Sequence, residues 1–248
     1  MGAAPLLLRI ASIILLLGFW QLGSSLWNNS LLPSPIEVLA VARAEWAAGA
    51  LSQHLGATLR RVIVSFTVAM LIGGAIGLLM GRSKTADQLL DPWLIFFLNI
   101  PALVIIILFY VWFGLGEITA VLAIAVNKIP NVIVTLREGA RTLNRDYTEM
   151  ARSFDLSSRK MLLHIILPQL LPFFMVAARS GISLIWKIVL VVELLGRGDG
   201  VGFQLHLYFQ LFDVSGILAY SISFILVMLA IEYAVLQPLE QRTNRWRQ

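Results

Sequence analysis

Six long apolar runs constrain the fold of this chain more than any other feature. A membrane-spanning helix needs roughly 20 mostly apolar residues to cross about 30 Å of hydrocarbon. The chain offers such runs at residues 5–26, 62–80, 93–113, 118–136, 170–195 and 214–236. Only 13% of its residues are charged, whereas a soluble domain carries about 25%. We therefore expect an all-α integral membrane protein with six transmembrane helices.

The composition also excludes several kinds of chemical site. The chain has no cysteine, which excludes disulfides, thiolate metal sites and iron–sulfur clusters. Its three histidines are far apart and have no metal-ligand spacing. Ser83 precedes Lys84 where a phosphate-binding Walker A loop requires glycine. We expect no catalytic residue, no metal and no cofactor in this chain, and no binding to nucleic acid.

The distribution of basic residues predicts the orientation in the membrane. Lys and Arg collect in cytoplasmic loops. If the N-terminus lies inside, the outer segments hold only Arg43, Arg60, Arg61 and Arg197. The cytoplasmic segments then hold Arg9, Arg82, Lys84, Arg137, Arg141, Arg145, Arg152, Arg159, Lys160, Arg242, Arg245 and Arg247. Both termini are therefore expected in the cytoplasm, which agrees with an even number of spans.

The second run carries small residues on one helix face. Gly73, Gly77 and Gly81 recur every four residues. Small residues at this spacing let two helix backbones approach closely in lipid. We expect this face to pack tightly against another helix of the bundle.

The polar stretch 137–164 is unusually long for a loop in a compact protein. Leu143, Tyr147, Met150 and Phe154 recur at the spacing of an amphipathic helix. The pattern breaks at residues 155–158, where a serine is suited to cap a second short helix over 159–167. Two readings remain: an interfacial helix resting on lipid headgroups, or a docking element for a soluble partner.

The same stretch resembles the EAA motif of ABC importer permeases. Glu149-Met150-Ala151 is followed after three residues by Asp155 and after nine more by Ile165-Ile166-Leu167-Pro168, as in that motif. Two positions depart from it, because Met150 replaces an alanine and Asp155 replaces a glycine. Glycine would serve a left-handed turn, a conformation that Asp also visits. The resemblance implies that Glu149, Met150, Ala151, Phe154, Asp155, Ile165, Leu167 and Pro168 couple the chain to an ATPase.

Further fragments are similar to one subgroup, the nitrate, sulfonate, taurine and bicarbonate permeases. They are Leu32-Pro33-Ser34-Pro35, His54-Leu55 with Thr58-Leu59-Arg60-Arg61, Trp112-Phe113-Gly114-Leu115-Gly116-Glu117, and Glu193-Leu194-Leu195-Gly196 with Gly200-Val201-Gly202. The resemblance implies a type I importer with the MetI-like fold in a bacterial inner membrane. Its partners would be a second permease copy, two ATP-binding cassette subunits that hold ATP and Mg, and an extracytoplasmic solute-binding protein.

This resemblance also implies the domain organisation, which is a single transmembrane permease domain over 1–248 with three segments. Residues 1–54 would form the first span and an outer loop, and residues 55–236 the permease core with the EAA loop at about 137–168. Residues 237–248 would be a cytoplasmic tail.

Polar groups inside the spans are costly in hydrocarbon and usually face a bundle interior or a wet cavity. Asn99 and Pro101 interrupt the third run, as a structural kink or as part of a pathway. Lys187 lies near mid-membrane, where it is either a cationic lining for an anionic solute or the neutralised half of an ion pair. Trp186 and Glu193 belong to the same expected pathway, although helix spacing argues against a pair between Lys187 and Glu193 within one chain.

Three other charged groups, Lys128, Arg179 and Glu232, are placed by the sequence near cytoplasmic span ends. Long side chains there reach the interface by snorkelling.

An importer permease for a small anionic solute is thus the favoured function, with alternating access in a permease dimer. A secondary transporter or a channel without an ATPase also explains six spans and buried charges. However, ion-coupled transporters show internal repeats and intramembrane acids, and here only Glu193 is deeply placed. A non-transporting membrane scaffold is a third alternative. The sequence does not identify the solute.

Overall fold

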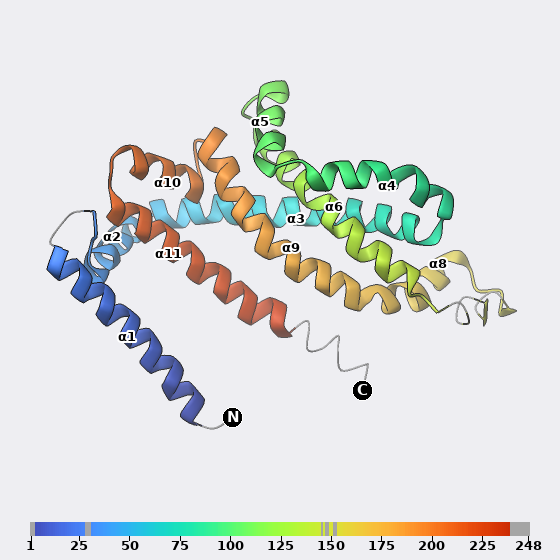
Figure 1. Cartoon of the computed structure of the whole chain (residues 1–248), viewed down its shortest axis with the longest axis horizontal. Coiled ribbons are helices and arrows are strands. Elements are labelled where there is room, and N and C mark those ends of the chain that lie inside the picture. The colour runs from blue at the N-terminus through green and yellow to red at the C-terminus, as the bar shows by residue number, and fades with distance from the viewer. Residues whose placement is uncertain (1–2, 28–30, 145, 147–148, 151–152, 239–248) are drawn as a thin grey trace.

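The computed structural model describes residues 3–27, 31–144, 146, 149–150 and 153–238, and over these ranges it is helical with short connections. Figure 1 shows an elongated bundle in which the long helix α3 (Ala50–Arg82) runs along the whole molecule. The predicted all-α fold is confirmed over the described residues.

Two helices precede the bundle. The helix α1 (Ala3–Trp27) extends away from the remaining helices in Figure 1. It is tied to the following segment because Trp20 Nε1 donates to the Pro33 carbonyl at 2.9 Å. The helix α2 (Pro35–Ala47) begins with a capping box: Ser34 Oγ accepts from the Glu37 amide, and the Glu37 carboxylate accepts from the Ser34 amide.

The glycine face of α3 packs on α6 (Glu117–Arg141). A Cβ atom added at Gly73 would lie 2.8 Å from Val132 Cβ, and one added at Gly77 would lie 2.9 Å from the Ile133 carbonyl oxygen. No side chain fits at these positions without moving α6. The predicted tight packing of this face is therefore confirmed.

The third apolar run forms two helices with a sharp bend. The helices α4 (Lys84–Asn99) and α5 (Ala102–Phe113) are bent by 96° at Ile100 and Pro101. Ile100 is extended, with φ −75° and ψ 127°, because the ring of the following proline disfavours helical backbone there. The interruption predicted at Pro101 is present, and it is a break between helices rather than a mild kink.

The predicted separate helix over 159–167 is wrong. Instead α8 (Ser158–Met161), a π-helical turn η1 (Leu162–Ile166) and α9 (Leu167–Gly196) form one apolar helical unit. Pro168 has no N–H and its ring crowds the carbonyl four residues earlier. The wider π turn accommodates this proline, and the Leu167 amide donates to the Leu162 carbonyl.

At the opposite end, the short helix α10 (Val201–Gln210) leads into α11 (Val214–Ile231). The Asp213 side chain caps α11 by accepting from the Gly216 amide at 3.0 Å. A second π turn, η2 (Glu232–Leu236), continues α11. Figure 1 shows α9 and α11 running side by side.

Four helical units are long and apolar enough to span a membrane within the described residues. They contain α3, α6, α9 with its preceding turns, and α11 with η2; the bent pair α4–α5 adds a fifth if it counts as one span. The apolar part of α1, Ala11–Leu26, is shorter. A six-span count is therefore still a prediction.

Candidate functional site

The loop between α6 and α8 exposes the residues that the sequence assigns to coupling. Met150 is 51% exposed and Phe154 is 75% exposed, and Glu149 is exposed beside them. Asp155 has a φ of 49°, the left-handed conformation expected at this motif position. Ala151 lies outside the described residues.

The second half of the motif is anchored to the bundle. Leu167 and Pro168 are exposed and Ile165 is half-buried. Between them Ile166 is buried, and it packs in a cluster with Leu170 and Ala140 of α6. The loop therefore projects from a fixed base at the end of α6 and α9.

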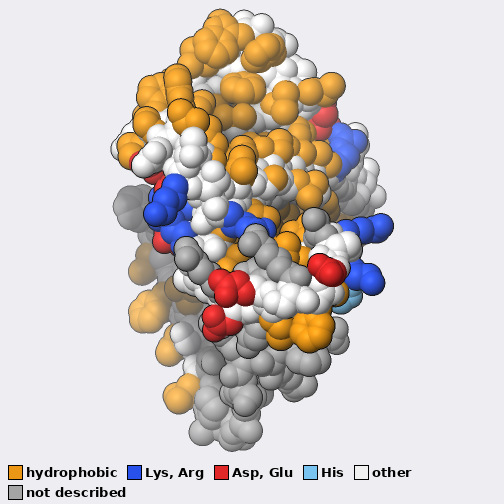
Figure 2. All heavy atoms as spheres, turned by 90° about the vertical axis from the view of Figure 1, so that its right-hand side faces the viewer, with side chains coloured by type: hydrophobic (Ala, Val, Ile, Leu, Met, Phe, Trp, Pro, Cys, Tyr) orange, Lys and Arg blue, Asp and Glu red, His pale blue; other side chains and the backbone are white. Residues whose placement is uncertain are grey.

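Ion pairs between α4 and α6 surround this base. Arg137 Nη1 lies 2.5 Å from Asp91 Oδ1, and Arg141 Nη2 lies 2.6 Å from Asp87 Oδ2. Figure 2 looks onto this end of the molecule and shows both charge types gathered across its middle, with hydrophobic side chains above them. The charges join α4 to α6 at the same end as the exposed loop.

Of the predicted pathway residues, Asn99 and Pro101 lie at the break between α4 and α5 and are exposed. Asn99 Nδ2 donates to the Ile95 carbonyl at 2.7 Å, within its own helix. Among the described residues, no hydrogen bond, ion pair or ring contact joins Asn99 or Pro101 to Trp186, Lys187 or Glu193. The structure therefore does not bring these two groups of predicted pathway residues together.

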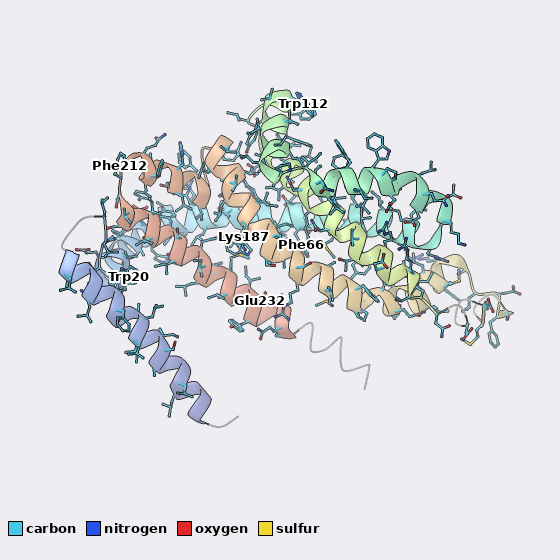
Figure 3. The ribbon with its side chains drawn as sticks, in the orientation of Figure 1. Trp20, Phe66, Trp112, Lys187, Phe212 and Glu232 are labelled. Atoms are coloured by element: carbon cyan, nitrogen blue, oxygen red, sulfur yellow. The ribbon has the colours of Figure 1, made fainter. Side chains whose placement is uncertain are left out.

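Trp186 and Lys187 form a pair on α9. The Trp186 ring packs edge-on against Phe224 of α11, with ring centroids 5.8 Å apart. Lys187 Nζ lies 5.5 Å from the Trp186 ring centroid, a cation–π contact. Among the described residues no carboxylate forms an ion pair with Lys187. Figure 3 shows Lys187 at the middle of the bundle.

Lys187 belongs to a stripe of exposed residues along α9. The stripe, called the α9 stripe below, repeats at three- and four-residue steps and consists of Val176, Ser180, Ser183, Lys187, Val191 and Leu194. Its central members are polar, although they lie inside a membrane-spanning helix. Polar residues at such a depth face a water-filled cavity or another helix rather than lipid.

Glu193, also predicted for the pathway, has a different environment. It is fully buried, and Arg61 Nη1 lies 2.7 Å from its Oε1 atom. Its other oxygen accepts from Thr58 Oγ1 and from the Gly202 amide, both at 2.9 Å. In this conformation the carboxylate is enclosed and fully hydrogen-bonded.

Arg61 is the centre of an ionic cluster that the sequence did not predict. It is called the outer cluster below, after the outer segments in which the sequence predicts Arg61 and Arg197. Its guanidinium also contacts the carboxylate of Asp199 and lies 2.8 Å from Glu117 Oε2, while Nη1 donates to the Asp199 carbonyl at 3.0 Å. Arg197 Nη2 adds a contact to Glu117 at 2.9 Å. One feature of the sequence could have indicated this cluster: Arg61 is a charged residue directly before the apolar run 62–80.

Close packing around the outer cluster explains the glycines of the fragment that begins at Glu193. Gly200 has a φ of 107°, and a Cβ there would collide with the Glu193 carboxylate. A Cβ at Gly202 would collide with the Leu190 carbonyl, and one at Gly196 would lie 2.5 Å from the Tyr110 ring. At Gly200 and Gly202 the chain thus passes so close to Glu193 that only glycine fits.

Asp199 lies between the spans in this cluster. Burial would raise the pKa of its carboxyl group, but the hydrogen bond from Arg61 and the charges of Arg61 and Arg197 hold this pKa below its usual value. Asp199 is therefore ionised throughout the neutral range.

Lys128 differs from its sequence prediction. It was expected near a cytoplasmic span end, yet it lies 11 residues after Glu117 in α6 and is only 1% exposed. The prediction is wrong because α6 continues to Arg141, so that Lys128 sits well within the helix. Arg179 of α9 forms an ion pair with Glu232 of η2, at 3.3 Å.

Comparison with known proteins identifies the family. Residues 49–238 match the family described as the binding-protein-dependent transport system inner membrane component. The chain is 32% identical to a protein named as a putative aliphatic sulfonates transport permease from Escherichia coli, over 79% of this chain and 77% of that protein. It is 28% identical to the taurine transport system permease of the same organism, over 96% and 89%. It is 30% identical to the nitrate import permease of a Synechocystis strain, over 81% and 76%.

The fold is also shared with solved transporters. A chain of the MetNI methionine ABC transporter, solved in inward-facing conformations, superimposes with a TM-score of 0.67 at 15% identity, over 79% of this chain and 98% of that one. An amino acid ABC transporter superimposes with a TM-score of 0.64 at 19% identity, over 82% of this chain and 97% of that one. The family match covers most of the chain. The protein is thus a multi-pass membrane permease of the binding-protein-dependent ABC importer family, and its role is transport.

Proposed function

We propose that two copies of this chain carry a small anionic solute into the cytoplasm by alternating access, driven by a separate ATPase that docks on the loop around residues 149–168. This ATPase consists of two ATP-binding cassette subunits, which hold ATP and Mg, and the remaining partner is an extracytoplasmic binding protein. Both termini lie in the cytoplasm of a bacterial cell, and the membrane is the inner membrane. The observation that carries the proposal is the α9 stripe with Lys187 at its centre.

The α9 stripe supports a second copy as the facing partner. Ser180, Ser183 and Lys187 are exposed in the single chain. The two serine hydroxyls donate to carbonyls of their own helix, but lipid would leave the Lys187 ammonium without a partner. Ser180 and Ser183 are small residues of the kind that line helix contacts in membranes. Two stripes facing each other across a two-fold axis would enclose a cavity lined by two ammonium groups.

The charge of that cavity supports an anionic solute. Lys187 lies ten residues before Arg197, which places it about 15 Å from the outer end of its span at 1.5 Å per residue. An isolated lysine at the centre of a span costs about 2.5–3.5 kcal/mol on insertion scales. Water in the cavity and a bound anion both offset this cost. The relatives named for sulfonates, taurine and nitrate carry solutes with an acidic or anionic group.

The exposed loop supports docking of the ATPase. Phe154 and Met150 present apolar side chains to water, and hydrophobic side chains of this kind serve as anchors in protein interfaces. They project from the base formed by Ile166 and Leu170, so that motion of a docked partner would be transmitted directly to α9. The same helix carries the α9 stripe.

The test substitutes residues of the loop in the assembled transporter. Ala151→Arg is expected to overfill the contact, and Phe154→Asp to remove the apolar anchor; both should abolish solute-stimulated ATP hydrolysis and uptake while leaving this subunit folded. Ala47→Arg, an equally bulky change at an exposed position of α2, is the matched control and should have no effect. Normal assembly and normal stimulated ATPase activity in Ala151→Arg would exclude docking through this loop.

A further inference from the structure

A second lysine inside the membrane has no assigned role. Lys128 is 1% exposed and stands about 16 Å from the outer end of α6 at 1.5 Å per residue. Among the described residues, neither a carboxylate nor a hydrogen-bond acceptor contacts its ammonium group. Arg61, which is equally buried, contacts three carboxylates. Of these two buried cations, Lys128 is thus the one without a counter-charge.

The absence of a counter-charge is energetically significant. A buried charge without a partner costs several kcal/mol, and such residues are kept in membrane helices chiefly where function needs them. A lysine that only fills space would be replaced at lower cost by methionine or leucine. The ammonium of Lys128 therefore calls for an anion that the chain itself does not supply.

The missing side chain of Gly181 on α9 leaves room for the end of the Lys128 side chain. A Cβ atom added at Gly181 of α9 would lie 3.0 Å from Lys128 Cε, 3.7 Å from Lys128 Nζ and 3.3 Å from Phe66 Cε2. The glycine thus allows the end of the lysine to sit where α3, α6 and α9 meet. Figure 3 labels Phe66 in the middle of the bundle.

The two unpaired lysines are staggered along α9. Gly181 precedes Lys187 by six residues, so Lys128 reaches α9 about 9 Å nearer the cytoplasm than Lys187. The same six residues turn the helix so that the two positions are about 120° apart around its axis. Lys187 lies on the exposed stripe, whereas Gly181 lies on the face that packs against α6.

We propose that Lys128 is a second binding residue for the anionic solute, which it receives after Lys187 when the contact between α6 and α9 opens beside Gly181. This inference rests on the proposed import function. It assigns the anion of the solute, a sulfonate, nitrate or carboxylate-like group, as the counter-charge that Lys128 lacks. Lys187 then acts at the mid-membrane position and Lys128 on the cytoplasmic side of it.

The first test removes the charge and keeps the shape. The assembled transporter, reconstituted in vesicles with its ATPase and binding protein, is assayed for uptake of ethanesulfonate, taurine, nitrate and bicarbonate. Lys128→Met should lower uptake of the transported anion about tenfold or more, the value of a lost charge-assisted contact. Lys128→Arg, which keeps the charge, should retain part of the anion uptake. The thermal stability of Lys128→Met should equal or exceed that of the unaltered protein, because a costly buried charge is gone.

A second variant tests the space at the tip. Gly181→Ala adds one carbon against the lysine stem and should reduce uptake less than Lys128→Met. Gly56→Ala is the matched control, since a Cβ at Gly56 meets no atom within 4 Å, and it should leave uptake unchanged. Equal uptake in Gly181→Ala and Gly56→Ala would contradict a role for this space.

The third test uses the absence of cysteine from the chain. A Lys128→Cys chain in the assembled transporter should react with an anionic sulfonate-bearing thiosulfonate reagent during ATP turnover, and a saturating transported anion should slow the reaction. Ala125→Cys, three residues earlier and 1% exposed, should stay unreactive. Equal reactivity at the two positions would overturn the proposal.

The outcomes separate this inference from the function on which it rests. If the unaltered transporter shows no uptake that depends on the binding protein and ATP, the proposed function fails. If that uptake is present and Lys128→Met matches it at equal expression, only the inference about Lys128 fails. A loss of folded protein in Lys128→Met would show a structural role and would also overturn the inference.

Discussion

The outer cluster and the two unpaired lysines, Lys187 and Lys128, place charge within the spans in opposite ways. Around Arg61, three carboxylates and a backbone carbonyl satisfy one guanidinium. Lys187 and Lys128 lie deeper along α9 and α6, and no carboxylate among the described residues pairs with either. The first arrangement holds helices together. The second leaves positive charge, which we propose the transported anion binds transiently.

This difference teaches where stability and function lie in the molecule. The outer cluster joins α3, α6, α9 and the turn before α10, so its loss should lower the stability of the folded protein. Loss of either lysine should leave that stability unchanged and lower only the rate of transport. Each substitution below should therefore change either the folded amount or the uptake rate.

The largest expected effect comes from breaking the outer cluster. Arg61→Met leaves Glu193 buried without its cation, and removing one partner of a buried pair costs about 3–5 kcal/mol. We expect little folded protein, measured by expression and by thermal unfolding in detergent. The double variant Arg61→Met with Glu193→Gln should recover part of the stability. Normal stability in Arg61→Met would show that the cluster is not structural.

A smaller loss of stability should follow from Gly200→Ala. The new methyl group would collide with the Glu193 carboxylate, and the φ of 107° is unfavourable for alanine. Strained backbone of this kind costs about 1–3 kcal/mol per residue. Gly198→Ala is the control, because a Cβ at Gly198 meets nothing within 4 Å. A comparison of the two melting temperatures measures the effect.

The lysine of the α9 stripe should give the reverse result. Lys187→Met is expected to keep normal thermal stability and to lower the initial rate of anion uptake about tenfold. If Lys187 instead neutralises a carboxylate in the assembled transporter, the variant should fold poorly, because that carboxylate would lose its cation. Thermal stability and uptake are measured on the same preparations.

The smallest expected effect concerns pH. The pKa of Asp199 is lowered in the folded protein, mainly by Arg61 against the opposing effect of burial. Its stabilising contribution is thus complete above the pKa of the unfolded chain and is lost as the pH falls through the lower folded pKa. The stability difference between the unaltered protein and Asp199→Asn should be constant from pH 7 to about 5 and should shrink below pH 4. A difference that grows on acidification would contradict the assigned partners.

The helical class and the close α3–α6 packing could be predicted from the sequence because they depend on local composition and glycine spacing. Asp155 adopts the left-handed conformation that its position in the motif predicts. The roles of residues 149–168 and of Lys187 stay predictions. The continuous unit from α8 through η1 into α9 could not be predicted, since it depends on a π turn that accommodates Pro168.

The buried charges were the harder part. Arg61 and Glu193 are 132 residues apart in the chain, and no periodicity within either helix reveals that they meet. Lys128 was misplaced because the end of an apolar run is a poor guide to the end of a helix. Lys128 is buried beside Gly181, where the absence of a side chain makes space for the lysine. That effect depends on the contact between α6 and α9, which the sequence alone does not reveal.

The most direct test of the account is one paired measurement on three variants. Folded yield and initial anion uptake per folded transporter are determined for Arg61→Met, Lys187→Met and Lys128→Met in the complete assembly. The account predicts a low folded yield only for Arg61→Met, and low uptake per folded transporter for the two lysine variants. Lysine variants that fold poorly, or that fold normally and transport normally, would contradict it.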